Sequence, residues 1–160
     1  MKHLIAFILF SQLFTTGNAQ DSCKAEMRTI IDEFTGEKTI TTSMIDPISM
    51  IKVIKGKNVV YYLSLKSYGK TIVVDKKGAI VLFSDGTKFS KQTAKVDYEQ
   101  GTGGERYIYT AFIELSSSEV AQFAEKLATD IRLYIFDNEI GERNARELKC
   151  GTTQLLQIHK

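Results

Sequence analysis

The feature that most restricts the fold of this sequence is a series of short β-branched and aromatic runs between residues 24 and 115. Gly, Asn and Asp separate these runs, and such a pattern is typical of strands joined by hairpins. The predicted strands span residues 26–34, 37–44, 50–55, 59–66, 70–75, 79–84, 87–97 and 105–115. Because the connections are short, neighbouring strands are expected to pair in antiparallel fashion.

The spacing of apolar residues changes from that of a strand to that of a helix after residue 115. Ser116 and Glu119 have the spacing of a capping box, and the apolar residues that follow recur on one helical face. This pattern predicts a helix over residues 117–129. Alternating apolar residues then predict a further strand over residues 130–136.

A second helix is predicted over residues 142–157, where Ala145, Leu148 and Leu155 fall on one stripe. Gly151 disfavours a helix in the middle of this segment. The predicted fold class is therefore α+β: a mainly antiparallel β-sheet or partial barrel of about eight or nine strands. One or two C-terminal helices are expected to pack on one face of that sheet.

The first 19 residues have the pattern of a secretory signal peptide. Lys2 and His3 form a short basic start, an apolar run follows, and small residues lead to a cleavage site after Ala19. The apolar run is shorter than the roughly 20 residues that a membrane-spanning helix needs, and no later stretch is apolar enough to insert stably. Residues 20–160 are therefore expected to form a single globular domain.

The sequence has two cysteines, Cys23 and Cys150. Export to an oxidising compartment favours a disulfide between them. A metal-binding or catalytic cysteine would need a second ligand or a base nearby, and the sequence has no CxxC motif. The basic start, the short apolar run and the absence of an Asn-x-Ser/Thr sequon predict a secreted or periplasmic bacterial protein.

Few residues suit catalysis. After cleavage the one histidine is His159, next to the C-terminus, where chains are usually frayed. Ser49 and Lys52, and likewise Ser67 and Lys70, have the spacing of a Ser-Lys pair but do not begin a predicted helix. No catalytic residue, metal site or cofactor is predicted from these patterns.

Two other short patterns do not have the residues that their chemistry needs. Gly69, Lys70 and Thr71 resemble the end of a phosphate-binding loop, but the earlier glycine is absent and a strand follows. Residues 137–142 are acidic like a calcium loop but lack its ligand spacing. A turn with solvated acids is predicted there.

Paired carboxylates leave a hydrolase without histidine as an alternative, because glycosidases need two acids whose separation a sequence does not give. The acids considered are Asp32, Glu33, Glu37, Glu114 and Asp137.

The net charge is +2, but charge is unevenly distributed along the chain. Residues 49–96 hold ten lysines and two acids, whereas residues 97–147 hold eleven acids and five basic residues. The lysines therefore could form a basic surface for an anionic partner. The alternative is that they keep sheet edges soluble. The lysines proposed for the surface are Lys55, Lys57, Lys66, Lys70, Lys76 and Lys77.

No arginine lies in the lysine-rich stretch, which argues against specific nucleic-acid recognition. Tyr68 and Tyr98 flank predicted turns and are candidate contact aromatics. The leading hypothesis is an exported, non-enzymatic module that binds another protein or an anionic envelope polymer. The second is a carrier of a small molecule or lipid, with an apolar pocket between the sheet and the helix at 117–129.

Overall fold

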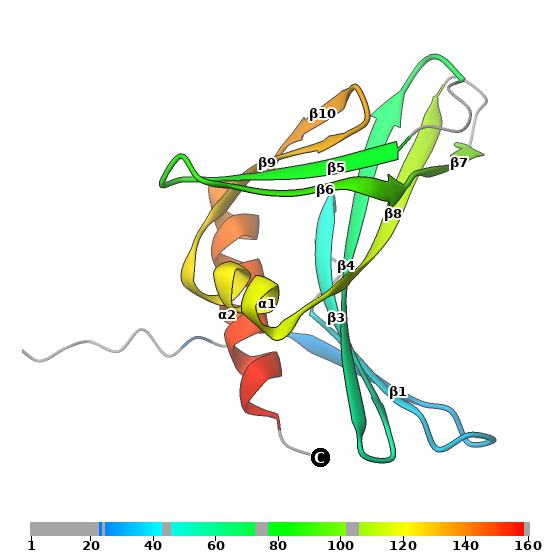
Figure 1. The fold of residues 1–160 in the computed structure, drawn as a ribbon, viewed down its shortest axis with the longest axis vertical. Coiled ribbons are helices and arrows are strands. Elements are labelled where there is room, and N and C mark those ends of the chain that lie inside the picture. The colour runs from blue at the N-terminus through cyan, green and yellow to red at the C-terminus, as the bar shows by residue number, and fades with distance from the viewer. Residues whose placement is uncertain (1–22, 24, 43–45, 73–76, 102–105, 159–160) are drawn as a thin grey trace, which may run out of the picture.

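The computed structural model describes residues 23, 25–42, 46–72, 77–101 and 106–158. These residues form ten strands and two helices, arranged as two antiparallel sheets (Figure 1). The described strands do not close into a barrel, and the two helices follow most of the strands in the chain. The predicted α+β class with C-terminal helices is confirmed. The proposed signal peptide, residues 1–19, lies outside the described residues.

Six strands form the long sheet, in the spatial order β1-β2-β3-β4-β8-β7. They are Met27–Ile31 (β1), Lys38–Thr42 (β2), Ile48–Lys55 (β3), Asn58–Gly69 (β4), Asp97–Gln100 (β7) and Tyr107–Leu115 (β8). The alternation of side chains along each strand gives this sheet an inner face and an outer face. On the inner face, Met50, Leu63 and Ile113 lie side by side in one row and are buried.

Four strands form the short sheet, in the order β10-β9-β5-β6. They are Lys77–Phe83 (β5), Lys88–Lys95 (β6), Ala128–Leu133 (β9) and Phe136–Glu139 (β10). The short sheet crosses one end of the long sheet (Figure 1). The chain passes from one sheet to the other at the buried Val96, between β6 and β7.

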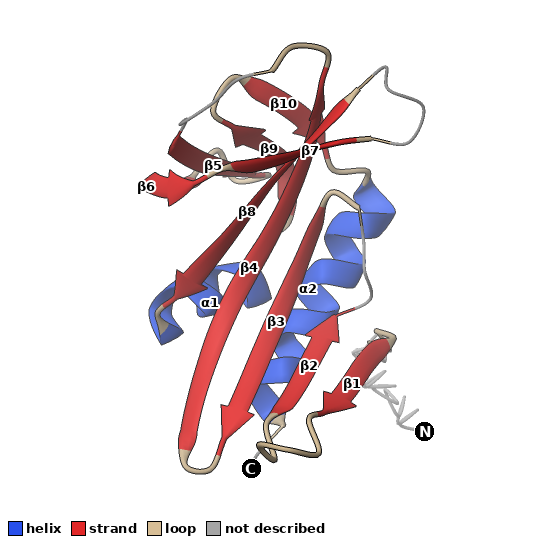
Figure 2. Cartoon of the chain, turned by 90° about the vertical axis from the view of Figure 1, so that its right-hand side faces the viewer, coloured by secondary structure: helices blue, strands red, loops and turns tan. Residues whose placement is uncertain are grey.

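The helices Ser117–Glu125 (α1) and Glu142–Gln157 (α2) pack against each other behind the long sheet, on its inner face (Figure 2). The capping box predicted at the start of α1 is confirmed, since Ser116 accepts from the Glu119 amide and Glu119 accepts from the Ser116 amide. Phe123 of α1 meets Phe83 and Phe89 of the short sheet edge-on. One core therefore joins both sheets and both helices.

The predicted strand over residues 70–75 is wrong for residues 70–72, which are not a strand, and residues 73–75 lie outside the described residues. Instead β4 continues three residues beyond its predicted end, because Ser67 and Gly69 still pair with β8. Gly69 has no side chain, so the Phe136 ring can pack against it; an added Cβ would lie 2.5 Å from that ring.

Other predicted boundaries also differ. The strand predicted over 87–97 is two strands in different sheets, because Val96 is buried where the chain turns. The helix predicted to reach residue 129 ends at Glu125, since Ala128 already pairs with β5. The strand predicted over 130–136 is the hairpin β9–β10, with Tyr134 at positive φ.

The acidic turn predicted over residues 137–142 is wrong in its first half, which is strand β10. Asp137 is paired there with Arg132 of β9, whose Nη2 lies 2.7 Å from Oδ2. The predicted helix over residues 142–157 is confirmed, and its stripe of Ala145, Leu148 and Leu155 is buried.

Candidate interaction surface

The structure does not bring together the Ser-Lys pairs that the sequence spacing suggested for catalysis. Ser49 and Lys52 lie on opposite faces of β3, because their positions differ by an odd number. Ser67 is buried and donates to the Phe136 carbonyl, whereas Lys70 is exposed. Within the described ranges, no group of three or more His, Cys, Asp or Glu could hold a metal ion.

The acids considered for a hydrolase are dispersed over three elements. Asp32, Glu33 and Glu37 belong to the hairpin between β1 and β2, Glu114 lies on β8 and Asp137 on β10. Asp32 accepts from the Phe34 and Thr35 amides and from the Thr35 hydroxyl, and Asp137 is paired with Arg132. These two carboxylates therefore have structural roles.

The proposed basic surface is divided between the two ends of the long sheet. Lys55 and Lys57 flank the β3–β4 turn, whereas Lys66 and Lys70 are at the far end of β4. At the usual rise per residue, Lys66 lies about 30 Å and Lys70 about 40 Å along the strand from Lys57. Lys77 begins β5, and Lys76 lies outside the described residues. Lys55 and Lys57 therefore do not form one patch with Lys66 and Lys70.

Both candidate aromatics are partly exposed and have contacts within the protein. The Tyr68 hydroxyl donates to the Asp46 carboxylate, and this hydrogen bond, with partial burial, raises the pKa of Tyr68 to about 12. Tyr98 lies on β7 with its ring centroid 6.2 Å from that of Tyr109.

In the region between the sheets and α1, where the sequence suggests a carrier pocket, Val120, Phe123 and Leu63 are buried in one core cluster. A surface cavity of about 520 Å³ lies elsewhere, beside the disulfide between Cys23 and Cys150.

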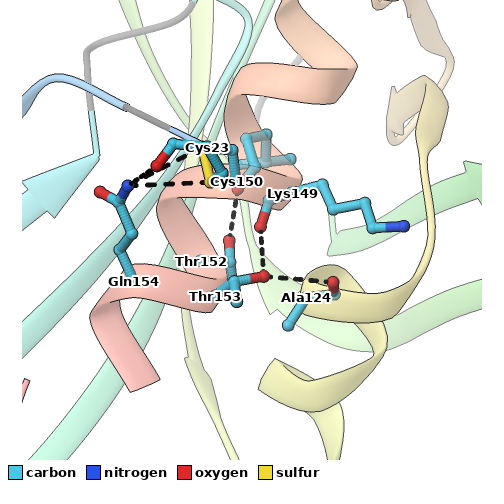
Figure 3. Close-up of a disulfide and its surroundings, with 8 residues drawn as sticks. Cys23, Ala124, Lys149, Cys150, Thr152, Thr153 and Gln154 are labelled. Carbon is cyan, nitrogen blue, oxygen red and sulfur yellow. Dashed lines mark hydrogen bonds between the residues drawn. A yellow bond between two sulfur atoms is a disulfide. The ribbon is translucent and has the colours of Figure 1, made fainter. Parts of the chain in front are cut away.

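The predicted disulfide is present, with the two Cα atoms 5.5 Å apart (Figure 3). The Gln154 side-chain amide donates to the Cys23 carbonyl at 2.5 Å. Ala25 packs close to Gly151, next to Cys150 on α2. The segment that leads into β1 is thereby fixed to α2, so the position of β1 is set by a covalent bond as well as by pairing with β2.

No described helix covers the outer face of the long sheet, which faces the viewer in Figure 2. Phe112 is 61% exposed on this face and stacks on Tyr62 at 5.0 Å. On the same face a row of small and β-branched residues crosses four strands, from Ile30 through Thr39 and Val53 to Val60. This row ends at the edge of the sheet, at β1.

Among the strands described, four are at sheet edges: β1 and β7 in the long sheet, β10 and β6 in the short one. Charged residues at an edge discourage the addition of another strand. β7 and β10 each carry two acids in four residues, and β6 carries three lysines. β1 differs, because its one charge is Arg28 and its isoleucines Ile30 and Ile31 are 50% and 61% exposed.

The register of β1 shows which of its backbone groups face outward. The Asp32 amide donates to the Glu37 carbonyl, so this opposite pair is hydrogen-bonded to β2. Bonded and non-bonded pairs alternate in antiparallel sheets. Met27, Thr29 and Ile31 therefore direct their N–H and C=O groups away from β2, along the outer edge of β1.

The hairpin that follows β1 is held by its own side chains. The hydrogen bond from the Thr35 hydroxyl, followed by that from the Phe34 amide, lowers the pKa of Asp32, and Gly36 supplies the positive φ of the turn. Phe34 is 100% exposed at the tip. An ordered hairpin thus presents Phe34, Ile30 and Ile31 to solvent at one corner of the molecule.

Comparison with known proteins gives no match to a family model, to a curated protein or to a solved structure. Neither helix in the described part of the chain is long and apolar enough to cross a membrane.

The β1 edge was not predicted from the sequence, because the candidate surface residues were chosen for their charge and β1 has just one charged residue. The signal was present: residues 27–31 contain no lysine or acid, whereas residues 88–95 contain three lysines. Which strands lie at edges, however, depends on a spatial order that the sequence does not give.

Proposed function

We propose that this protein is an exported, non-enzymatic interaction module that binds an extended polypeptide segment along the outer edge of β1. The observation that supports this proposal is the contrast between β1 and the three other sheet edges described. β7 and β10 each have two acids and β6 has three lysines, whereas β1 has two exposed isoleucines. In strand addition, backbone hydrogen bonds supply affinity and alternate side chains supply specificity. β1 offers both.

The energetics favour an added strand here. The outward N–H and C=O groups of Met27, Thr29 and Ile31 already have the spacing of a ladder, so a segment would meet a preformed template. Burial of Ile30 and Ile31 removes apolar surface from water, at roughly 25 cal/mol per Å². The fixed segment before β1 reduces the ordering that binding requires.

An exported location is supported by two features. Residues 1–19 have the pattern of a signal peptide, and the disulfide between Cys23 and Cys150 is compatible with an oxidising compartment outside the cytoplasm. The mature protein would meet its partner in the periplasm or outside the cell.

The edge is preferred to the two other sites considered. A basic surface for an anionic polymer requires the lysines to act together, and Lys55 and Lys57 lie at the opposite end of β4 from Lys66 and Lys70. A carrier requires an interior space, whereas Val120 and Phe123 of α1 are buried in the core that joins the helix to both sheets.

Site-specific photocrosslinking in the producing organism tests the proposal. A photoreactive residue at Ile30 should give a discrete adduct, and the same residue at Leu82, similarly exposed on β5, should not. Adding Thr29→Pro, which removes an outward N–H, should abolish the adduct from position 30. Equal adducts from positions 30 and 82, or an adduct that is insensitive to Thr29→Pro, would contradict strand addition at β1.

A further inference from the structure

We infer that the segment bound at the outer edge of β1 is β1 of a second copy of this chain, paired antiparallel across a two-fold axis with Ile30 opposite Ile30. This inference rests on the proposed function and names its partner. The resulting dimer would have one continuous twelve-stranded sheet, made from two long sheets joined at β1.

The backbone is compatible with this pairing. Because Thr29 and Ile31 direct their polar groups outward, Thr29 of one copy and Ile31 of the other form a hydrogen-bonded pair on each side of the axis. Ile30 then lies in the non-bonded pair at the axis, where side chains come closest. The geometry requires no change in the pairing of β1 with β2.

Charge favours this register over the neighbouring register centred on Thr29. With Ile30 at the axis, Arg28 lies opposite Asp32 of the second copy, and the reciprocal pair forms on the other side of the axis. With Thr29 at the axis, Asp32 would face Glu26 of the second copy, and like charges directly opposite are destabilising. Self-pairing is thus complementary in charge with Ile30 at the axis and unfavourable with Thr29 at the axis.

Apolar contacts favour the same register. On the outer face, the row formed by Ile30, Thr39, Val53 and Val60 would meet the identical row of the second copy, with the two Ile30 side chains adjoining at the axis. The same register brings the hairpin tip, where Phe34 is fully exposed, beside residues 25–26 of the second copy. In the dimer, Ile30 and Phe34 would therefore contact residues of the second copy.

Sedimentation analysis of the oxidised mature chain over a wide concentration range tests the dimer. Wild type and Thr29→Val, which keeps the outward N–H, should dimerise. Thr29→Pro should raise the dimer dissociation constant by about tenfold or more, because it removes hydrogen bonds at the interface. Proline is tolerated at an edge where the N–H faces solvent, so circular dichroism and thermal unfolding should confirm that this variant is folded. If it is not folded, Ile31→Lys provides the same test.

Cysteine substitution tests the register. Ile30→Cys should form an intermolecular disulfide, because non-bonded pairs place Cα atoms about 4.5 Å apart. Thr29→Cys, adjacent in sequence but not at the axis, should form it at least tenfold more slowly.

A wild-type protein that is monomeric at every concentration, or a dimer unaffected by Thr29→Pro, would overturn this inference. If the purified protein is monomeric while Ile30 crosslinks to a different protein in cells, the strand-addition function survives and the second copy is excluded as its partner. If neither experiment gives an adduct or a dimer, both proposals fail.

Discussion

Lys52 has a structural role that its charge alone would not indicate. It is 3% exposed on the inner face of β3, and its ammonium donates to the carbonyls of Leu155 and Ile158 at 2.9 and 2.6 Å. The same ammonium lies 5.3 Å from the centre of the Tyr61 ring. A cation at this position satisfies the last carbonyls of α2 and opposes the negative end of its dipole. Lys52 therefore joins the end of α2 to the long sheet.

Lys52→Met should lower the free energy of unfolding by about 2–3 kcal/mol, because it leaves carbonyls at the end of α2 without their charged donor. Urea unfolding measures the change. Lys55→Met, on the same strand but exposed, is the matched control and should change stability by less than about 0.5 kcal/mol. Equal effects of the two substitutions would contradict the capping role.

The phenol of Tyr68 should lose its proton at a higher pH than an ordinary tyrosine. Its hydrogen bond to Asp46 raises its pKa from 10.0 to about 12 in the folded protein. Since the folded state then holds the phenolic proton more tightly, this contribution to stability is present below pH 10 and is lost as the pH rises toward 12. The tyrosinate absorbance of wild type minus that of Tyr68→Phe should show a midpoint near 12, and Asp46→Asn should lower it. A midpoint near 10 in wild type would exclude the hydrogen bond.

The burial of Lys52 could be predicted from the sequence in part. Lys52 was grouped with the other lysines of residues 49–96, yet it alternates with Met50 and Ile54, which are both buried. The period of a strand thus already placed it on the core side. Its partners at the end of α2 are more than 100 residues away and were not predictable.

At the scale of elements, α2 shows why a glycine can stand inside a helix. Gly151 is buried against β2, where an added Cβ would lie 2.7 Å from Thr42 Cγ2 and 3.3 Å from Ala25 Cβ. Thr42 cannot easily move, because its hydroxyl accepts from the Met50 amide at 3.0 Å. The glycine that weakened the helix prediction is therefore what allows close packing of α2 on the long sheet.

Gly151→Ala should destabilise the protein, because overpacking costs about 1–3 kcal/mol and exceeds the gain of about 1 kcal/mol in helix propensity. Thr42→Ser removes Cγ2 but keeps the hydroxyl, so the double variant should recover most of the loss. Thermal unfolding of the two single variants and the double variant measures this coupling. A stabilised Gly151→Ala, or purely additive effects, would contradict close contact at this position.

The end of a helix or strand could be predicted when it depends on residues close in sequence, and could not when it depends on residues far away in the chain. The capping box at Ser116 and the stripe of α2 are local signals, and both were predicted correctly. The ends of β4 and α1 depend on pairing with β8 and β5, which are distant in sequence, and these ends were missed. Val96 is an ordinary apolar residue in the sequence and marks a change of sheet only in three dimensions.

For the whole molecule, the disulfide between Cys23 and Cys150 spans 127 residues and joins the beginning of the described chain to α2. A bond that closes so long a loop restricts the unfolded chain strongly, and the chain-entropy relation gives about 5 kcal/mol as an upper value. It also fixes the approach to β1, the strand proposed to bind a partner.

Replacing both cysteines with serine should lower the free energy of unfolding by about 2–5 kcal/mol, measured by urea unfolding of the oxidised wild type and the double variant. Added reductant should lower the stability of wild type toward that of the variant and leave the variant unchanged. Unfolding curves that coincide for oxidised wild type and variant would show that the bond adds no stability.

The fold class and the cysteine pairing could be predicted because they depend on composition, period and the number of thiols. The division into two sheets, and the edge positions that follow from it, could not, because short connections do not specify which sheet a strand joins.

The positions of the two cysteines also order events during synthesis. Cys23 emerges from the ribosome early, and within these 160 residues its thiol meets no intramolecular counterpart until Cys150 has been made. Any disulfide that Cys23 forms before that moment must join it to another molecule. The covalent link can therefore close only after residue 150 has been made, and a polypeptide truncated before residue 150 would carry Cys23 as an unpaired thiol.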